Sequence, residues 1–332
     1  MSQPTGSEST KVAVLRGGYS REAEVSAKSA REVAAGLETA GYTVAIIDLG
    51  SALTRDLLDF NPHVVFPALH GSPGEDGTVQ GFLEMLDLPY VGAGVHGSAT
   101  AMDKSLAKAV FARAGLPVLP DVVVAPDRDV YEAASEVRQK LGERIVVKPL
   151  AQGSALGVQL LPNGGDIAAA INNSREAAAD VSGPAAVLVE PYVMGREMTV
   201  GVLDLEGAAP QSFPVIEIRT AQGEWYDFTN RYTVGRSEHI LPAPISSQAS
   251  ARIREIGIQA HQSLGLHELS RADLIVTDDE SITLLEVNTL PGMTPTSLYP
   301  DGARAVGYSF SALMQALVAS AQRRHKSKTH LS

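Results

Sequence analysis

The sequence contains no cysteine. This absence excludes disulfide bonds, thiolate zinc sites and a cysteine nucleophile. Long apolar runs are missing too, because no segment approaches the roughly 18 uninterrupted apolar residues that a membrane-spanning helix needs. The first ten residues, MSQPTGSEST, are polar and lack the apolar core of a signal peptide. We therefore expect a soluble cytoplasmic protein that does not contact membranes.

The chain also lacks an excess of positive charge, since its formal net charge is −11. A protein that binds nucleic acid or an anionic membrane surface needs a basic field, so neither partner is expected. Any phosphate group should instead meet local lysines and a metal ion. The basic run QRRHKSK at 322–328 is expected to be a solvated chain end.

A length of 332 residues predicts two or three packed units. In the first hundred residues, predicted strands at 11–15, 43–48 and 63–70 alternate with predicted helices at 20–40 and 78–86. This alternation predicts an α/β fold with a parallel sheet. Ligands of such sheets bind beyond the carboxyl ends of the strands.

The rest of the chain changes its pattern near residue 195. Up to 190 we expect a small αβ unit, with strands at 144–148 and 186–189 and a glycine-rich loop at 153–157. Beyond it we expect antiparallel strands at 197–203 and 213–218, a helix at 247–264, paired strands at 272–276 and 283–287, and a final helix at 309–321. The long stretch around 225–241 is expected to be a structureless loop, typical of a functional lid.

Two carboxylates and an amide form the strongest candidate site. Glu286 and Asn288 lie two residues apart on a predicted strand, so their side chains share a face. Asp273 lies at the start of the neighbouring predicted strand. An oxygen-only set of this kind suits Mg²⁺ that bridges nucleotide phosphates. The alternative is an acidic surface on an antiparallel pair, which the apolar neighbours at 284, 285 and 287 disfavour.

Two lysines are candidates for holding phosphate. Lys148 ends a buried apolar run, and the Gly/Ser loop at 152–157 follows it, so an ammonium group and backbone N–H groups could meet phosphate oxygens together. A glycine-containing hairpin is the alternative explanation of this loop. Lys104 starts a predicted helix, where a solvated lysine is the alternative.

Two further segments are weaker candidates. The proline-containing segment at 189–197 offers backbone groups that could read an adenine edge, and Glu190 and Glu197 could accept hydrogen bonds from its amino group or from ribose; an ordinary strand-turn-strand is the alternative. In the first hundred residues, His70, Glu22 and Ser26 are expected to face one crevice. For the histidine, a structural role is the alternative.

Five motifs occur in a fixed order from the first unit to the last: HGSPGEDG at 70–77, MDK at 102–104, VKP at 147–149, GREMTVG at 195–201 and LEVNTLPGMTPTS at 285–297. Together they resemble the D-alanine–D-alanine ligase family of the ATP-grasp superfamily. The likeness runs from about residue 11 to 320. It implies three αβ domains: a substrate-binding domain at 1–101, a central ATP-grasp subdomain at 102–190, and a C-terminal subdomain at 191–332 with the metal site and the lid.

The resemblance implies that ATP lies between the central and C-terminal subdomains. The positions that match ATP contacts are Lys104, Lys148 and Ser154 for the phosphates, Glu190, Tyr192 and Val193 for adenine, and Glu197 for ribose. Asp273, Glu286 and Asn288 match the ligands of two Mg²⁺ (or Mn²⁺) ions. Whether K⁺ also activates the protein stays open.

The reaction implied by the resemblance phosphorylates the carboxylate of one D-alanine, and the amine of a second D-alanine then attacks the acyl phosphate. Its product, D-alanyl-D-alanine, is a peptidoglycan precursor for the bacterial cell wall. Arg271 and the Gly292 backbone N–H match the groups that stabilise the acyl phosphate and the oxyanion.

The amino-acid contacts carried over in the same way comprise two subsites and a lid. The matching positions are Glu22 and His70 for the first D-alanine, Ser297 and Leu298 for the second, and the lid residue Tyr232, which closes a network with Ser154 and Glu22. The resemblance also suggests a homodimer.

Four positions depart from the family pattern: Ala23, Gln152, Ala155 and Arg231 stand where an arginine, a glutamate, a serine and a lysine are usual. They leave open a ligase with another acceptor, such as D-lactate, D-serine or a specialised amino acid. A nucleotide-binding regulatory protein without turnover is a further alternative, although the metal and phosphate positions are all filled. A nicotinamide-binding dehydrogenase is disfavoured because the opening glycines form no Gly-x-Gly-x-x-Gly motif.

Overall fold

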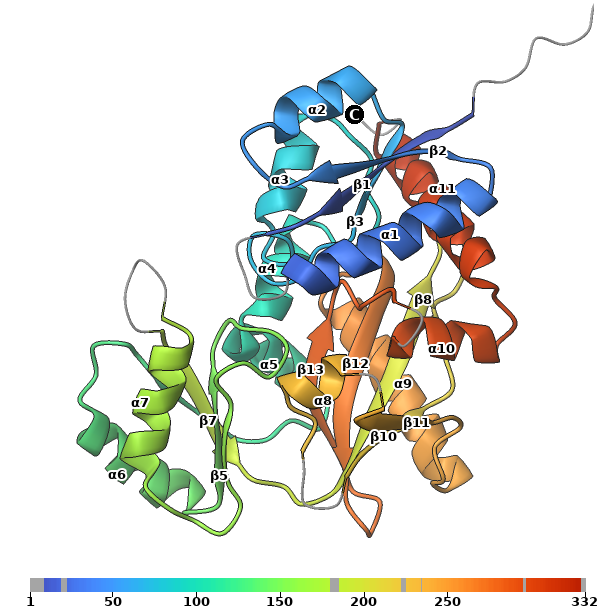
Figure 1. Ribbon diagram of the computed structural model, residues 1–332. Coiled ribbons are helices and arrows are strands. Elements are labelled where there is room, and N and C mark those ends of the chain that lie inside the picture. The colour runs from blue at the N-terminus through green and yellow to red at the C-terminus, as the bar shows by residue number, and fades with distance from the viewer. Residues whose placement is uncertain are drawn as a thin grey trace, which may run out of the picture.

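The computed structural model describes residues 9–18, 23–179, 185–221, 225–233, 235–294 and 297–329. Its described residues contain three separate β-sheets (Figure 1). No helix of these residues is long and apolar enough to cross a membrane.

The first sheet is parallel, as the alternation of strands and helices predicts. Its order is β2-β1-β3, built from β1 (Lys11–Arg16), β2 (Thr43–Asp48) and β3 (Val64–Pro67). β1 and β3 are buried almost throughout, as is typical of parallel strands that are covered on both faces. The helices α1 (Ala23–Thr39), α2 (Leu53–Phe60) and α3 (Thr78–Met85) accompany this sheet. We call these elements the N-terminal unit.

The second sheet is antiparallel and belongs to the central unit. Its order is β4-β7-β5-β6, from β4 (Val122–Val124), β5 (Ile145–Pro149), β6 (Gln159–Leu161) and β7 (Val187–Pro191). The helices α6 (Val130–Leu141) and α7 (Ile167–Ala177) pack on one face through Val137 and Ile171. Because side chains alternate along a strand, β5 turns Ile145 and Val147 toward these helices and Lys148 toward the opposite face.

The third sheet has six strands and forms the centre of the C-terminal part. Its order is β11-β10-β8-β12-β13, and β9 (Gln211–Ser212) pairs with β8. The strands are β8 (Arg196–Asp204), β10 (Ile216–Thr220), β11 (Ser237–Ile240), β12 (Glu268–Val276) and β13 (Ile282–Asn288). The helix α9 (Ser247–Ser263) covers this sheet with Ile253 and Ile256.

Two short helices lead from the N-terminal unit to the central unit. They are α4 (Val95–Met102) and α5 (Lys104–Arg113), and the Asp103 side chain caps α5 by accepting from two of its first backbone N–H groups. The residues 101 and 190, at which the sequence places domain ends, lie inside α4 and β7 and not between elements. The domain boundaries stay a prediction.

The last helix of the chain packs against the N-terminal unit. After α10 (Leu298–Ala305), the helix α11 (Phe310–Thr329) packs along α1 and shares a core with β1 and β3, in which Leu313 and Leu317 meet Val33 (Figure 1). The expectation of a solvated end at 322–328 is wrong for Arg324, which is buried. The helix continues through this basic run because its inner face has a polar partner, described below.

The structureless loop expected at 225–241 is also wrong in part. It contains α8 (Phe228–Tyr232), which begins where the Asp227 side chain accepts from the backbone N–H of Asn230 at 2.8 Å. It also contains β11, which pairs with the edge of β10. A side-chain cap and a free sheet edge supply the backbone with partners here.

Candidate functional site

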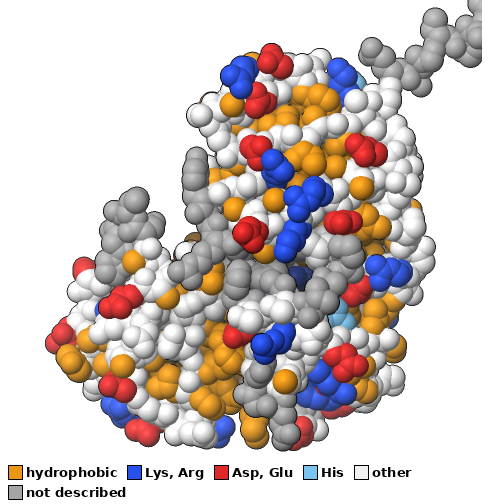
Figure 2. Space-filling model, in the orientation of Figure 1, with side chains coloured by type: hydrophobic (Ala, Val, Ile, Leu, Met, Phe, Trp, Pro, Cys, Tyr) orange, Lys and Arg blue, Asp and Glu red, His pale blue; other side chains and the backbone are white. Residues whose placement is uncertain are grey.

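A large cavity, with a volume of about 380 Å³, lies where the units meet. Residues of α1, β12, β13, the 152–154 loop and the segment at 288–298 line it. A second cavity of about 180 Å³ adjoins it and is lined from β5, β7 and β8. The two cavities share Lys104, Gln152 and Glu286, so they form one continuous site. In Figure 2, several Lys and Arg side chains lie in a line down the front of the upper part, despite the net negative charge.

The paired strands β12 and β13 form one wall of the site. Asp273 lies directly opposite Glu286, and Arg271 lies opposite Asn288. Residues two apart on a strand, and residues directly opposite on an antiparallel pair, share a face. All four side chains therefore belong to the same face. Asp273 stands in the middle of β12 and not at a strand start, because the strand begins five residues earlier, at Glu268.

Arg271 and Asp273 form a buried, two-point ion pair. Arg271 Nε donates to Asp273 Oδ1 at 2.8 Å, and Nη2 donates to Oδ2 at 2.7 Å. The hydroxyl of Thr199 also donates to Asp273, at 2.7 Å. Burial alone would raise the pKa of Asp273, but the guanidinium charge holds it below its ordinary value. Burial would lower the pKa of Arg271, and Asp273 raises it, so both groups stay charged.

Lys104 joins the glycine-rich loop to β13. Its ammonium group donates to the backbone carbonyl of Gln152 at 2.7 Å and lies 3.4 Å from Glu286 Oε2. Burial would raise the pKa of Glu286, but the charge of Lys104 lowers it. Lys104 is thus held by direct contacts and is not the solvated lysine given as the alternative, and Glu286 is ionised.

The oxygen atoms of the proposed metal set already have protein partners. Arg271 holds both oxygens of Asp273, Lys104 approaches Glu286, and Asn288 Oδ1 accepts from the backbone N–H of Leu290 at 2.9 Å. Among the described residues, no group of three His, Cys, Asp or Glu side chains is placed to hold a metal ion. Two carboxylates and an amide still fit the chemistry of Mg²⁺, since each oxygen has more than one lone pair.

A buried charge cluster lies behind the second cavity. Glu190 is 2% exposed; Lys148 Nζ lies 2.5 Å from its Oε2, and Lys108 Nζ contacts its Oε1. Lys108 also lies 2.9 Å from Asp121. Burial would raise the pKa of Glu190, but the two lysines lower it. Burial would likewise lower the pKa of Lys148, and Glu190 raises it.

The sequence motifs do not include two residues of this cluster, Lys108 and Asp121. A signal for the lysine was present, because Lys108 follows Lys104 by four residues on a helix and so lies on the same face. No local pattern points to Asp121, which precedes a strand of three residues.

His70 stands between the N-terminal unit and β12. Its imidazole is buried, and its Nε2 lies 3.5 Å from the Ser29 hydroxyl, which in turn accepts from the backbone N–H of Met293 at 3.4 Å. Burial, and then the charge of Arg271, lower the pKa of His70 from 6.5 to about 4. His70 is therefore neutral at physiological pH.

The segment after β13 completes the large cavity. Gly292 lines it without a side chain, and a Cβ atom there would lie 2.9 Å from the Ser297 hydroxyl. Ser297 is the residue before α10, and its hydroxyl accepts from the backbone N–H of Thr294 at 3.0 Å. Leu298, the first residue of α10, also lines the cavity.

Of the other residues predicted for the site, some line the two cavities and some lie outside the described residues. Ser154 lines the large cavity with a backbone φ of 50°, in the left-handed region. Tyr192, Val193 and Glu197 line the second cavity, and burial raises the pKa of Glu197. Glu22 lies outside the described residues, as does the side chain of Tyr232 at the end of α8.

The lining residues that were not predicted from the sequence include Lys28, Glu32, Glu75 and Tyr226. The ring of Tyr226 lies 4.5 Å from the guanidinium of Arg231, whose Nε donates to the Tyr226 carbonyl at 3.0 Å. Lys28 and Glu32 lie four residues apart, on the α1 face that the helical period assigns to the cavity. That period could have indicated the pair once the crevice was placed.

Comparison with known proteins gives consistent matches. The family described as D-ala D-ala ligase C-terminus matches residues 110–319, and D-ala D-ala ligase N-terminus matches residues 50–93. A D-alanine–D-alanine ligase of Desulforudis audaxviator is 42% identical over 316 residues, which cover 95% of this chain and 99% of that protein.

Two solved structures resemble the whole chain. The D-alanine–D-alanine ligase of Bacillus anthracis, complexed with ATP, has a TM-score of 0.80 and 28% identity, and the likeness covers 96% of this chain and 100% of that one. The VanG D-Ala:D-Ser ligase of Enterococcus faecalis has a TM-score of 0.79 and 29% identity, with 95% and 100% covered. The fold is that of ATP-grasp ligases, as the motifs predict. The chain belongs to the D-alanine–D-alanine ligase family.

Proposed function

We propose that the protein joins two D-alanine molecules into D-alanyl-D-alanine at the expense of ATP, for peptidoglycan precursor synthesis in the cytoplasm. One observation carries the proposal: two adjoining cavities share Lys104 and Glu286. A nucleotide in the smaller cavity would direct its terminal phosphate toward these residues, and a small amino acid in the larger cavity would reach them from the other side. Membership of the family supports both assignments.

The smaller cavity would hold ATP. Glu190 raises the pKa of Lys148, and Lys104 lies 3.4 Å from Glu286, so both side chains would be able to meet phosphate oxygens. Ser154 would add a donor from the loop. We assign adenine to the segment of Glu190, Tyr192 and Val193, and ribose to Glu197.

The large cavity would hold the amino acids. We assign the first D-alanine to Glu22 and the neutral His70, and the carboxylate of the second to Ser297 and Leu298. Tyr232, with Ser154 and Glu22, would close the site. In the reaction, a carboxylate oxygen of the first D-alanine attacks the terminal phosphorus of ATP, and ADP leaves. The amine of the second then attacks the acyl carbon, loses a proton and displaces inorganic phosphate.

Arg271 would meet the charge that develops in both steps. Its guanidinium lines the large cavity while Asp273 fixes its orientation at two points. Together with the backbone N–H of Gly292 it would stabilise the acyl phosphate and the oxyanion. Asp273, Glu286 and Asn288 would hold two Mg²⁺ or Mn²⁺ ions, which supply neutralisation of phosphate charge when bound. Activation by K⁺ and assembly as a homodimer belong to the same proposal.

The direct test is release of inorganic phosphate from ATP and Mg²⁺ with D-alanine alone, with D-alanine plus D-lactate, and with D-alanine plus D-serine. We expect release with D-alanine alone, and D-alanyl-D-alanine as the product by mass spectrometry. An absence of release with D-alanine would overturn the proposal. A mixed product as the main species would assign the other acceptor, which the fold does not exclude because a D-Ala:D-Ser ligase shares it.

A further inference from the structure

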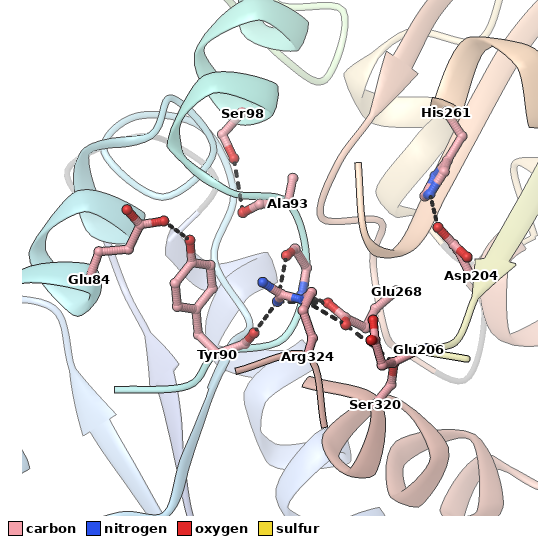
Figure 3. Close-up of polar contacts among 11 residues, drawn as sticks. Glu84, Tyr90, Ala93, Ser98, Asp204, Glu206, His261, Glu268, Ser320 and Arg324 are labelled. Atoms are coloured by element: carbon pink, nitrogen blue, oxygen red, sulfur yellow. Dashed lines mark hydrogen bonds and ion pairs between the residues drawn. The ribbon is translucent and has the colours of Figure 1, made fainter. Parts of the chain in front are cut away.

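A buried ion pair outside both cavities joins the two ends of the chain. Arg324 of α11 and Glu268 at the start of β12 are 8% and 1% exposed. Arg324 Nε donates to Glu268 Oε1, and Nη2 donates to Oε2, each at 3.0 Å (Figure 3). Neither residue lines the cavities described above.

The pair also binds the segment between α3 and α4. Arg324 Nη2 donates to the backbone carbonyls of Tyr90 at 2.8 Å and Gly92 at 3.3 Å. The backbone N–H of Gly92 donates to Glu268 at 3.0 Å, and the Ser320 hydroxyl donates to it at 3.3 Å. Figure 3 shows the guanidinium between the Tyr90 backbone and the Glu268 carboxylate. Both carboxylate oxygens therefore have two donors each.

Each of these segments leads to the proposed active site. Arg271 lies three residues beyond Glu268 on β12. The segment at 90–92 follows the sheet of the N-terminal unit and continues through α4 to Lys104. The contacts thus join the N-terminal unit, which carries the proposed subsite for the first D-alanine, to the strand that carries Arg271. No residue of the ATP-lining strands β5 and β7 takes part in these contacts.

Two observations indicate that the pair does more than add stability. A buried ion pair often contributes no more to stability than apolar residues of the same size, and its better-attested use is to specify one arrangement. α11 already packs on α1 through apolar side chains. Glu268 also has a φ of 57°, in the left-handed region where glycine is the unstrained residue. A carboxylate therefore stands at a position whose backbone favours a residue with no side chain.

We propose that Glu268 and Arg324 are positioning residues, which fix the placement of the N-terminal unit against Arg271 and thereby align the first D-alanine with the phosphoryl-transfer centre. This inference rests on the proposed function for the identity of the substrate. It predicts different effects on the two substrates, because the residues bonded to the ion pair are Tyr90, Gly92 and Ser320, and none of them lines the proposed ATP cavity.

The test compares R324M with the matched control R323M, which replaces an adjacent, exposed arginine on the same helix. For each protein we would measure the KM for D-alanine at saturating ATP, kcat, and the Kd of a non-hydrolysable ATP analogue by calorimetry. We expect R324M to raise the KM for D-alanine about tenfold or more, since a shift of about 1 Å in a substrate contact has effects of this order. The Kd of the nucleotide should stay within about twofold of wild type, as in R323M.

Three outcomes decide the matter. An unchanged KM for D-alanine in folded R324M would overturn the inference, and so would a parallel loss of nucleotide affinity, because a purely structural role predicts that both substrates are affected or neither. If R324M does not fold, E268Q and R324K take its place with the same measurements. A wild-type protein inactive with D-alanine would instead contradict the proposed function. In that case, hydrogen exchange of the peptide at 90–102 decides the inference: faster exchange in R324M than in R323M supports it, and equal exchange overturns it.

Discussion

The buried imidazole of His70 makes stability depend on pH in a calculable way. Its pKa is lowered from 6.5 to about 4, first by burial and then by the charge of Arg271. Between these two values the unfolded chain binds a proton at this residue and the native protein does not. Stability must therefore fall as pH decreases through this window, and the loss is complete below pH 4. We predict that His70→Gln removes this component.

The magnitude follows from the two pKa values. At pH 5 the unfolded state gains about 2 kcal/mol from protonating His70, and the native state gains almost nothing, so the native protein loses about 2 kcal/mol relative to pH 7.5. Below pH 4 the loss reaches about 3 kcal/mol, because a pKa difference of one corresponds to about 1.4 kcal/mol. Other titrating groups contribute equally to wild type and variant, so the difference between the two proteins isolates His70.

The assay is urea unfolding of wild type and His70→Gln at pH 7.5, 6 and 5, with free energies from linear extrapolation. The variant should be less pH-sensitive than wild type by about 2 kcal/mol between pH 7.5 and 5. His96→Gln, which removes an exposed imidazole near the same unit, is the control and should follow wild type. Identical pH dependence in wild type and His70→Gln would refute the claim that this imidazole is buried in its neutral form.

Three further predictions concern the charge cluster, the glycine at the site and the metal. Lys108→Met removes a cation that Glu190 and Asp121 share, so the free energy of unfolding in urea should fall by about 3 kcal/mol. The exposed control Lys140→Met should change it by no more than about 0.5 kcal/mol, and equal losses in the two variants would contradict the charge cluster. Gly292→Ala places a Cβ atom 2.9 Å from the Ser297 hydroxyl, so kcat should fall at least about tenfold with little change in ATP affinity. An unaltered kcat would exclude a close approach of substrate to the Gly292 backbone. Chelation of divalent ions should abolish phosphate release. It should leave the melting temperature of the ligand-free protein unchanged, because both carboxylates of the proposed metal set already have cationic partners. A large drop in melting temperature would show that these partners do not stabilise the carboxylates without metal.

The sequence predicts the parallel sheet and the face shared by Glu286 and Asn288 because both depend on short-range periodicity. β1 and β3 are apolar throughout, and the period of two fixes which side chains of β13 point together. The position of Asp273 was harder to predict. Its strand begins with Glu268, Leu269 and Ser270. Partners distant in the sequence help to bury the first two, Arg324 for Glu268 and the core shared with α11 for Leu269, and a polar residue at a left-handed φ gives no local sign of a strand start.

Long-range pairing also explains why the basic run at 322–328 was misjudged. The sequence offers charged residues at a chain end, where solvent is the ordinary partner. Arg324 is buried because Glu268, 56 residues away, and the carbonyls of Tyr90 and Gly92, more than 230 residues away, converge on it. No window of local sequence contains these partners. Around it, Arg323, Lys326 and Ser327 are exposed as expected.

Glu190 shows how the structure can change the role of a residue that the sequence identifies. The sequence offers its carboxylate as an acceptor for the amino group of adenine. In the fold, Lys148 and Lys108 each take one of its two oxygens, and the side chain is almost wholly buried. Its principal contacts are thus with the lysines, one of which lines the smaller cavity, where we propose that ATP binds. We infer that Glu190 serves the nucleotide chiefly by keeping Lys148 charged and in place, so that reading of the adenine edge would fall to the backbone of residues 191–193.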